Sequence, residues 1–213
     1  MTPLRITATL SGPMMLPRLG IMLDSLLTHR VATISGLDPV QWVDKLAEIP
    51  IPIAMSECGR IALCSNSLFE VETWEKSFQN RRFPMSQAQS MGATALKRIL
   101  VGGGLSKSWR TPREVVHVES DQVVWFAIGD HAKVAELLAT VSGLGPRRGV
   151  GLGRVASWKV EAAEPWPGFP VLLDGKPLRR LPLDWPGLGE HRLEYGVLAP
   201  PYWQRHREEP CAV

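Results

Sequence analysis

The sequence predicts an α+β domain whose strands and helices follow the order βαββαβ, with a basic insertion in its middle and a proline-rich extension at its C-terminus. Two stretches have apolar residues three and four positions apart, as one face of a helix requires. Several shorter stretches alternate apolar and polar residues, as half-buried strands do. Half of the 18 prolines fall between Pro165 and Pro210, so few regular helices are expected there.

The N-terminal half begins with a predicted strand at Leu4–Leu10, which a Gly-Pro pair ends. A helix is expected at about Leu19–Ala32, because its leucines recur at helical spacing. Two short apolar runs, Ile51–Met55 and Ile61–Cys64, flank a turn that contains glycine. We therefore predict that these two runs pair as a hairpin.

The middle of the chain is polar and basic from Phe69 to Thr111 and contains a triple glycine. It is expected to be an insertion, at about residues 70–112, with a short helix inside it. After the insertion, Glu114–Glu119 and Val123–Ile128 alternate in polarity and are predicted to form a second hairpin.

The last elements of the domain are a helix and a strand. His131–Val141 has a helical apolar face, with Asp130 as the expected N-cap and Gly143 as the expected stop signal. Arg154–Glu161 alternates and places Trp158 on its apolar side, as a half-buried strand would.

Without the insertion, residues 1–161 therefore match a ferredoxin-like βαββαβ domain. RNA-recognition motifs share this arrangement, but their aromatic RNP sequence is missing here. Residues 162–213 are expected to form an extension that packs over the domain as extended chain. Disorder is the competing interpretation, and Trp166, Trp185 and Trp203 argue against it.

The composition indicates a protein with one core and no membrane span. A chain of 213 residues that is 45% hydrophobic can bury a core, and it has no run of 18 apolar residues. The N-terminus has no signal-peptide pattern, and Cys58, Cys64 and Cys211 form neither a disulfide framework nor a zinc spacing. We expect a cytoplasmic protein with free thiols and no membrane partner.

Positive charge is concentrated in two stretches, although the net charge is only +3. Neither Lys76–Arg113 nor Leu137–Val160 contains an acidic residue, and both contain several basic ones. Arginine outnumbers lysine 17 to 7, which favours bidentate contacts to phosphate. Such segregation indicates a face that binds a polyanion, with a solvated basic loop as the alternative.

Within the second basic stretch, residues 143–154 join glycines to arginines. Glycine lets backbone N–H groups approach a ligand closely, and guanidinium groups match phosphate oxygens. A plain turn between a helix and an edge strand is the alternative interpretation. The predicted binding residues of this loop are Gly143, Gly145, Arg147, Arg148, Gly149, Gly151, Gly153 and Arg154.

The position of this loop excludes two familiar nucleotide-binding motifs. A dinucleotide-binding glycine motif follows a strand and opens a helix, so that the phosphates meet the helix N-terminus. Here the loop follows a helix C-terminus, which is the unfavourable dipole end for a phosphate. The Gly-Lys-Ser/Thr sequence of a P-loop is also missing.

The GxG…RR…GxGxGR pattern between the last helix and strand resembles the glycine-rich loop of the RAMP superfamily of CRISPR-associated proteins. More of the chain is similar to one branch, the Cas-five-like subunit of type IV CRISPR effector complexes. The similar segments occur in the same order as in that branch and touch most of the chain: Pro3–Leu10, Leu23–Leu27, Ile51–Ala54, Trp125–Asp130 and Leu178–Pro182.

The resemblance implies a non-catalytic subunit that holds the repeat-derived 5′ handle of the CRISPR RNA and caps one end of the complex. Its partners would be this RNA, the backbone and large subunits and, indirectly, target DNA. The glycine-rich loop would contact the RNA. From charge alone, we expect the insertion to act as a thumb with further RNA-binding residues: Arg81, Arg82, Lys97, Arg98, Lys107, Trp109 and Arg110.

The alternative is a metal-independent endoribonuclease that processes CRISPR RNA, because relatives in the superfamily cut RNA. Its candidate catalytic residue is His29, which also has an ordinary dipole reason to lie in the last turn of a helix. A scaffold that binds no nucleic acid would leave the segregated charge unexplained. The sequence has no HxH, HExxH or paired-carboxylate spacing, so neither a metal nor another cofactor is expected.

Overall fold

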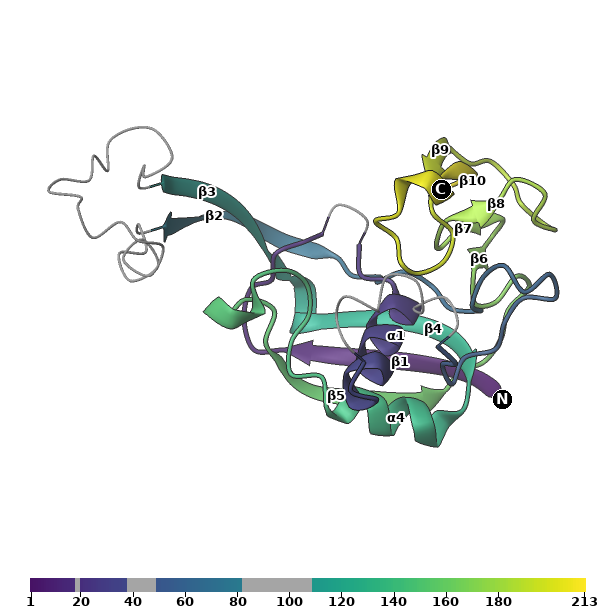
Figure 1. Ribbon diagram of the computed structural model, residues 1–213, viewed down its shortest axis with the longest axis horizontal. Coiled ribbons are helices and arrows are strands. Elements are labelled where there is room, and N and C mark those ends of the chain that lie inside the picture. The colour runs from purple at the N-terminus through teal and green to yellow at the C-terminus, as the bar shows by residue number, and fades with distance from the viewer. Residues whose placement is uncertain (18–19, 38–48, 82–108) are drawn as a thin grey trace, which may run out of the picture.

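An antiparallel three-stranded sheet forms the centre of the molecule (Figure 1). The computed structural model describes residues 1–17, 20–37, 49–81 and 109–213. The central strand β1 (Thr2–Leu10) lies between β4 (Gln122–Gly129) and β5 (Val155–Ala162). The β1–β4 register runs from Thr2–Gly129 to Thr9–Gln122. The expected first and last strands of the domain are thus both present, within two residues of their predicted bounds.

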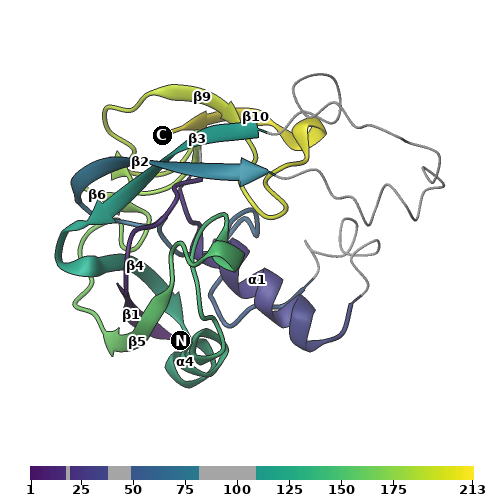
Figure 2. The same ribbon diagram turned by 90° about the vertical axis from the view of Figure 1, so that its left-hand side faces the viewer.

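Two helices, α1 (Leu23–Ile34) and α4 (His131–Ala139), cover one face of this sheet (Figures 1 and 2). Leucines and valines of both helices pack with the inward side chains of β1 and with Trp125. Trp125 is fully buried and donates a hydrogen bond from Nε1 to the Ile21 carbonyl at 2.7 Å. Asp130 caps α4 as expected, accepting from the Lys133 backbone N–H. The predicted helices are confirmed, although α1 begins at Leu23.

The expected stop signal of α4 is wrong. The helix ends at Ala139 with Thr140 as its C-cap, and Gly143 instead forms a β-bridge with Arg154. Val141 remains almost fully buried beyond the helix end. The helical spacing of Val141 from the apolar residues of α4 therefore indicates that Val141 packs against the core, and it does not indicate where the helix ends.

The predicted hairpin at residues 51–64 is present in a short form. Met55 bridges Ala62, and backbone hydrogen bonds run from the Leu63 N–H to the Ala54 carbonyl at 2.7 Å and from the Ser56 N–H to the Ile61 carbonyl at 2.8 Å. Residues of this segment and of the chain just after it pair with the free edge of β4: Ile53 with Gly129, Cys64 with Ala127 and Leu68 with Val124. The segment therefore extends the central sheet on the β4 side.

The insertion contributes a long two-stranded ribbon made of β2 (Val71–Arg81) and β3 (Trp109–Val118). The expected short helix is absent from the described part of the insertion, and residues 82–108 lie outside it. The predicted second hairpin is wrong as well, because β3 pairs with β2 while β4 pairs with β1. Ser120 and Asp121, both with positive φ, turn the chain between the two sheets in a 3-10 segment, η4 (Glu119–Asp121).

The C-terminal extension packs on the domain and forms small sheets of its own instead of remaining extended chain. Its core includes Ile61 from the domain beside Val171, Leu181 and Leu198. Its regular elements are β6 (Leu172–Leu173), β7 (Lys176–Pro177), β8 (Leu181–Pro182), β9 (Leu193–Gly196), η6 (Arg205–Arg207) and β10 (Glu209–Ala212), with sheet orders β6-β7 and β8-β10-β9.

Aromatic side chains join the extension to the outer face of the sheet. The ring of Phe126 on β4 meets Trp166 edge-on, with ring centroids 4.8 Å apart, and Phe169 contacts both rings. Trp166 also donates a hydrogen bond to the Leu172 carbonyl. Helices therefore cover one face of the central sheet, and the extension contacts the other face at β4, where Arg5, Ser157 and Lys159 of the neighbouring strands remain exposed.

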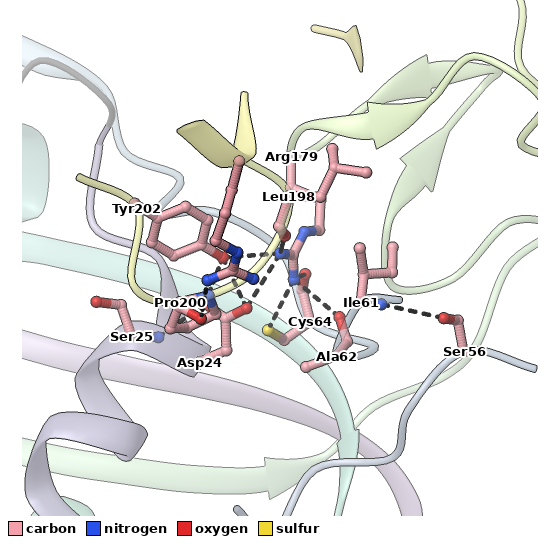
Figure 3. A network of polar contacts seen from close by, with 11 residues as sticks. Asp24, Ser25, Ser56, Ile61, Ala62, Cys64, Arg179, Leu198, Pro200 and Tyr202 are labelled. Carbon is pink, nitrogen blue, oxygen red and sulfur yellow. Dashed lines mark hydrogen bonds and ion pairs between the residues drawn. The ribbon is translucent and has the colours of Figure 1, made fainter. Parts of the chain in front are cut away.

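A buried ion pair also ties the extension to α1 (Figure 3). The Arg179 guanidinium lies 3.0 Å from an Asp24 carboxylate oxygen and donates to the carbonyls of Ala62 and Leu198 at 2.8 Å. The Tyr202 hydroxyl donates to the same carboxylate at 2.7 Å. Burial raises the pKa of the Tyr202 hydroxyl, so this group remains a donor at neutral pH.

Candidate nucleic-acid interface

The glycine-rich loop, residues 143–154, has a closed neck and an open tip. At the neck, the Leu144 N–H donates to the Gly153 carbonyl at 2.7 Å, and the Val155 N–H donates to the Ser142 carbonyl at 3.0 Å. At the tip, the chain makes a single 3-10 turn, η5 (Arg148–Val150). The backbone of the neck is thus satisfied internally, while the tip is presented to solvent.

The glycines of the loop serve two different purposes. A Cβ added at Gly153 would lie 2.1 Å from the Leu144 carbonyl oxygen, and one added at Gly145 would lie 2.5 Å from the Met15 carbonyl oxygen. Both residues also have positive φ, so glycine is required there by the fold itself. A Cβ at Gly149 or Gly151 would meet nothing within 4 Å. The tip glycines leave open space around the backbone.

Three arginines of this loop are exposed: Arg147, Arg148 and Arg154. Within the described residues none of them forms an ion pair, whereas the nearby Lys159 pairs with Glu161 at 2.7 Å. Arg147 has a φ of 64°, which is uncommon for a residue with a side chain and places it at the sharp turn into the tip. The loop therefore presents positive charge that the described part of the protein does not neutralise.

One backbone segment, residues 11–15, joins this loop to the ribbon. On one side, the Gly153 N–H donates to the Pro13 carbonyl, and the Ser11 N–H donates to the Arg154 carbonyl, both at 2.9 Å. On the other side, Met14 pairs with Val116 of β3 through two hydrogen bonds of 2.8 and 2.9 Å. The loop and the ribbon consequently leave the body at the same end (Figures 1 and 2).

The sequence prediction missed the supporting role of this segment. The Gly-Pro pair after the first strand was interpreted only as a strand break. Its proximity to the loop depends on the β1–β5 pairing, which brings Leu10 opposite Val155. No local pattern in the sequence signals that pairing.

The ribbon holds part of the other predicted RNA-binding set. Arg81 and Trp109 are register partners at its distal end, and Arg110 is paired with Asn80. For these residues the structure describes the backbone. The remaining predicted residues lie outside the described part of the chain: Arg82, Lys97, Arg98 and Lys107.

The proximal half of the ribbon is acidic. Lys76 stands opposite Glu114 in the register, and His117 contacts Glu75 at 3.3 Å. At the ribbon base, a hydrogen bond and the negative charge of Glu70 raise the pKa of Glu119. In the described part of the ribbon, the basic residues Arg81, Arg110 and Arg113 therefore belong to the distal half.

His29 lies on the exposed side of α1, near the glycine-rich loop. Partial burial and the positive charges of Arg148 and Arg30 lower its pKa. A lowered pKa leaves the imidazole neutral at physiological pH, which is the form that accepts a proton. The structure therefore brings the candidate catalytic residue close to one of the predicted RNA-binding arginines.

The described residues hold neither a cluster of metal ligands nor a helix that could span a membrane. No group of three or more His, Cys, Asp and Glu side chains is placed there to hold a metal ion. No described helix is long and apolar enough to cross a membrane. All three cysteines are free thiols, with Cys64 and Cys211 buried.

Comparison with known proteins identifies a family. The family described as CRISPR type IV associated protein Csf3 matches residues 70–213, which include the ribbon, the glycine-rich loop and the extension. No curated protein matches the chain. Because the matched region spans well over half of the 213 residues, the chain belongs to the Csf3 family of type IV CRISPR-associated proteins.

Proposed function

We propose that this protein is a non-catalytic RNA-binding subunit of a type IV CRISPR effector complex. It holds the repeat-derived 5′ handle of the CRISPR RNA between the glycine-rich loop and the distal ribbon, and it caps one end of the complex. The backbone and large subunits are its protein partners, and target DNA is met only indirectly. The family membership supports a place in such a complex.

The observation that carries this proposal is the shared support of the two basic elements. Residues 11–15 hydrogen-bond to the loop on one side and to β3 on the other. A strand of RNA that contacts the unpaired arginines of the loop is thereby directed toward the positively charged end of the ribbon. Backbone N–H groups at the open tip add donors for phosphate oxygens.

A ferredoxin-like core is part of the same proposal. Leu68 and Cys64 pair with β4, β4 pairs with β1 and β1 pairs with β5. The strands of this sheet, counted along the chain, are then β1 as the first, the bridged segment as the second, β4 as the third and β5 as the fourth. Their spatial order is second, third, first, fourth, with both helices on one face, as in a ferredoxin-like sheet. The glycine-rich loop then connects the second helix to the last strand.

The test is binding of the full-length protein to a repeat-containing RNA at several salt concentrations. We expect log affinity to fall linearly with log salt, with a slope of about −0.7 for each phosphate contacted on a single strand. Combined Arg147→Ala and Arg148→Ala substitutions should weaken binding and make the slope shallower by about 1.4. Arg192→Ala with Arg205→Ala is the control pair in the extension. If this pair lowers RNA affinity as much as the loop pair does, the glycine-rich loop is not the RNA-binding site.

A second candidate function, endoribonuclease activity, has one observation in its favour, the position and lowered pKa of His29. A neutral imidazole there could take the proton of a 2′-hydroxyl as that oxygen attacks the adjacent phosphorus. The bond from phosphorus to the 5′ oxygen breaks, and the leaving oxygen takes a proton from water. The discriminating result is the length of the RNA after incubation. A product ending in a 2′,3′-cyclic phosphate that His29→Ala abolishes would replace the non-catalytic assignment.

A further inference from the structure

Arg30 of α1 is an additional cation at the neck of the glycine-rich loop. Its Nε donates to the Oγ1 of Thr140, the residue that caps the C-terminus of α4. Thr140 lies three positions before Gly143, where the neck begins. This hydrogen bond uses one edge of the guanidinium, and a guanidinium has five N–H donors. The remaining donors of Arg30 have no partner in the described part of the chain.

Arg148 lies at the same place, although it belongs to the loop tip in the sequence. Its aliphatic stem packs across Gly143, because a Cβ added at Gly143 would lie 3.2 Å from both Cγ and Cδ of Arg148. The Arg148 side chain therefore lies back over the neck of the loop. Its charge acts on His29, which is next to Arg30 in sequence.

The two guanidinium groups have no carboxylate to balance them among the described residues. Glu136 lies one turn before Thr140 on α4 and forms an ion pair with neither arginine. Asp24 at the start of α1 is buried and committed to Arg179. Cations gathered without a counter-charge create the positive potential that attracts an anion.

We propose that Arg30 and Arg148 share one backbone phosphate of the bound RNA, at the neck of the glycine-rich loop. This inference rests on the proposed RNA-binding function and extends it to α1. The two residues come from elements far apart in sequence, and each guanidinium can donate two parallel hydrogen bonds to the oxygens of one phosphate. The RNA path then runs from the loop tip over the neck and onto the C-terminal half of α1.

A double-mutant cycle on RNA binding tests the shared phosphate. Arg30→Gln, Arg148→Gln and the double variant are compared with the wild-type chain on the same repeat-containing RNA. Each single change is expected to lower affinity about tenfold or more, as loss of a hydrogen bond to a charged group does. The fold loss of affinity in the double variant should be clearly smaller than the product of the two single fold losses, because the first change already weakens the contact that the second one removes. Additive losses would overturn the shared site.

A matched variant separates RNA contact from a structural role of Arg30. Thr140→Val removes the acceptor of the Arg30 hydrogen bond and also the bond that Thr140 Oγ1 donates to the Leu137 carbonyl, but it keeps the Arg30 charge. Thr140→Val should therefore lower stability against urea at least as much as Arg30→Gln. RNA affinity should fall in Arg30→Gln and change less than about twofold in Thr140→Val. Equal losses of affinity in both variants would show that Arg30 only holds α1 against α4.

The outcomes distinguish this inference from the proposed function. If Arg147→Ala with Arg148→Ala weakens RNA binding and Arg30→Gln does not, the site on α1 is wrong and the RNA-binding function stands. If the wild-type chain binds no RNA, both are wrong.

Discussion

Replacing Arg179 with methionine tests the buried link between α1 and the C-terminal extension. The side chains of Arg179 and Asp24 are 0% and 1% exposed, so each depends on the other for compensation of its charge. Methionine occupies a similar apolar volume but leaves the carboxylate unpaired. Removing one partner of a buried ion pair costs about 3–5 kcal/mol. Since 1 kcal/mol shifts Tm by about 2–4 °C at this chain length, Tm should fall by roughly 6–20 °C.

Urea and thermal unfolding, followed by circular dichroism, measure this loss. Arg192→Met is the matched control, because that side chain is 76% exposed and its pair with Glu194 should contribute at most about 1 kcal/mol. The double change Arg179→Met with Asp24→Asn removes the orphaned charge and should be more stable than Arg179→Met alone. A loss below about 1 kcal/mol in Arg179→Met would refute the reasoning.

Three other predictions concern single positions. Gly153→Ala should weaken RNA binding and lower stability, because the added Cβ would lie 2.1 Å from the Leu144 carbonyl oxygen across the neck. Gly149 faces open space, so Gly149→Ala should leave the free energy of unfolding in urea titrations unchanged. Glu119→Gln should stabilise the fold at neutral pH. The hydrogen bond and the negative charge of Glu70 raise the pKa of Glu119, so the folded state loses stability as pH rises through that pKa. The free energies of unfolding of the variant and the wild type should therefore become equal in acid. A difference that persists in acid would contradict the repulsion between Glu70 and Glu119. Cys58 is the exposed thiol of the three and should react first with a thiol reagent under native conditions; rapid loss of all three thiols would be inconsistent with the packing.

Local chemistry made several elements predictable. Asp130 has the side chain that an N-cap needs, and it accepts the expected backbone hydrogen bond. Alternation located β1 and β5 within two residues because a half-buried strand exposes every second side chain. The glycine and arginine content of residues 143–154 indicated a charged loop with open backbone. Each of these signals resides in a few neighbouring residues.

Pairing partners were not predictable in the same way. The sequence around Glu114–Ile128 indicated two strands, and the prediction joined them to each other because they are adjacent. The structure pairs β3 with β2 and β4 with β1 instead. In this arrangement the apolar side chains of β3 and β4 are buried in the same core as those of β1. Alternation specifies which face of a strand is apolar and does not specify the neighbour that covers it.

The sequence by itself determined the family, the positions of the helices and main strands, and the chemistry of the glycine-rich loop. Only the tertiary structure showed which glycines the neck requires, that residues 11–15 support both basic elements, and that Arg30 hydrogen-bonds to Thr140, three positions before the loop. It also showed the Arg179–Asp24 pair, whose members are 155 positions apart. The physical reason is that propensity and capping act over one or two turns of chain, whereas these contacts exist only after the sheet has brought distant segments together.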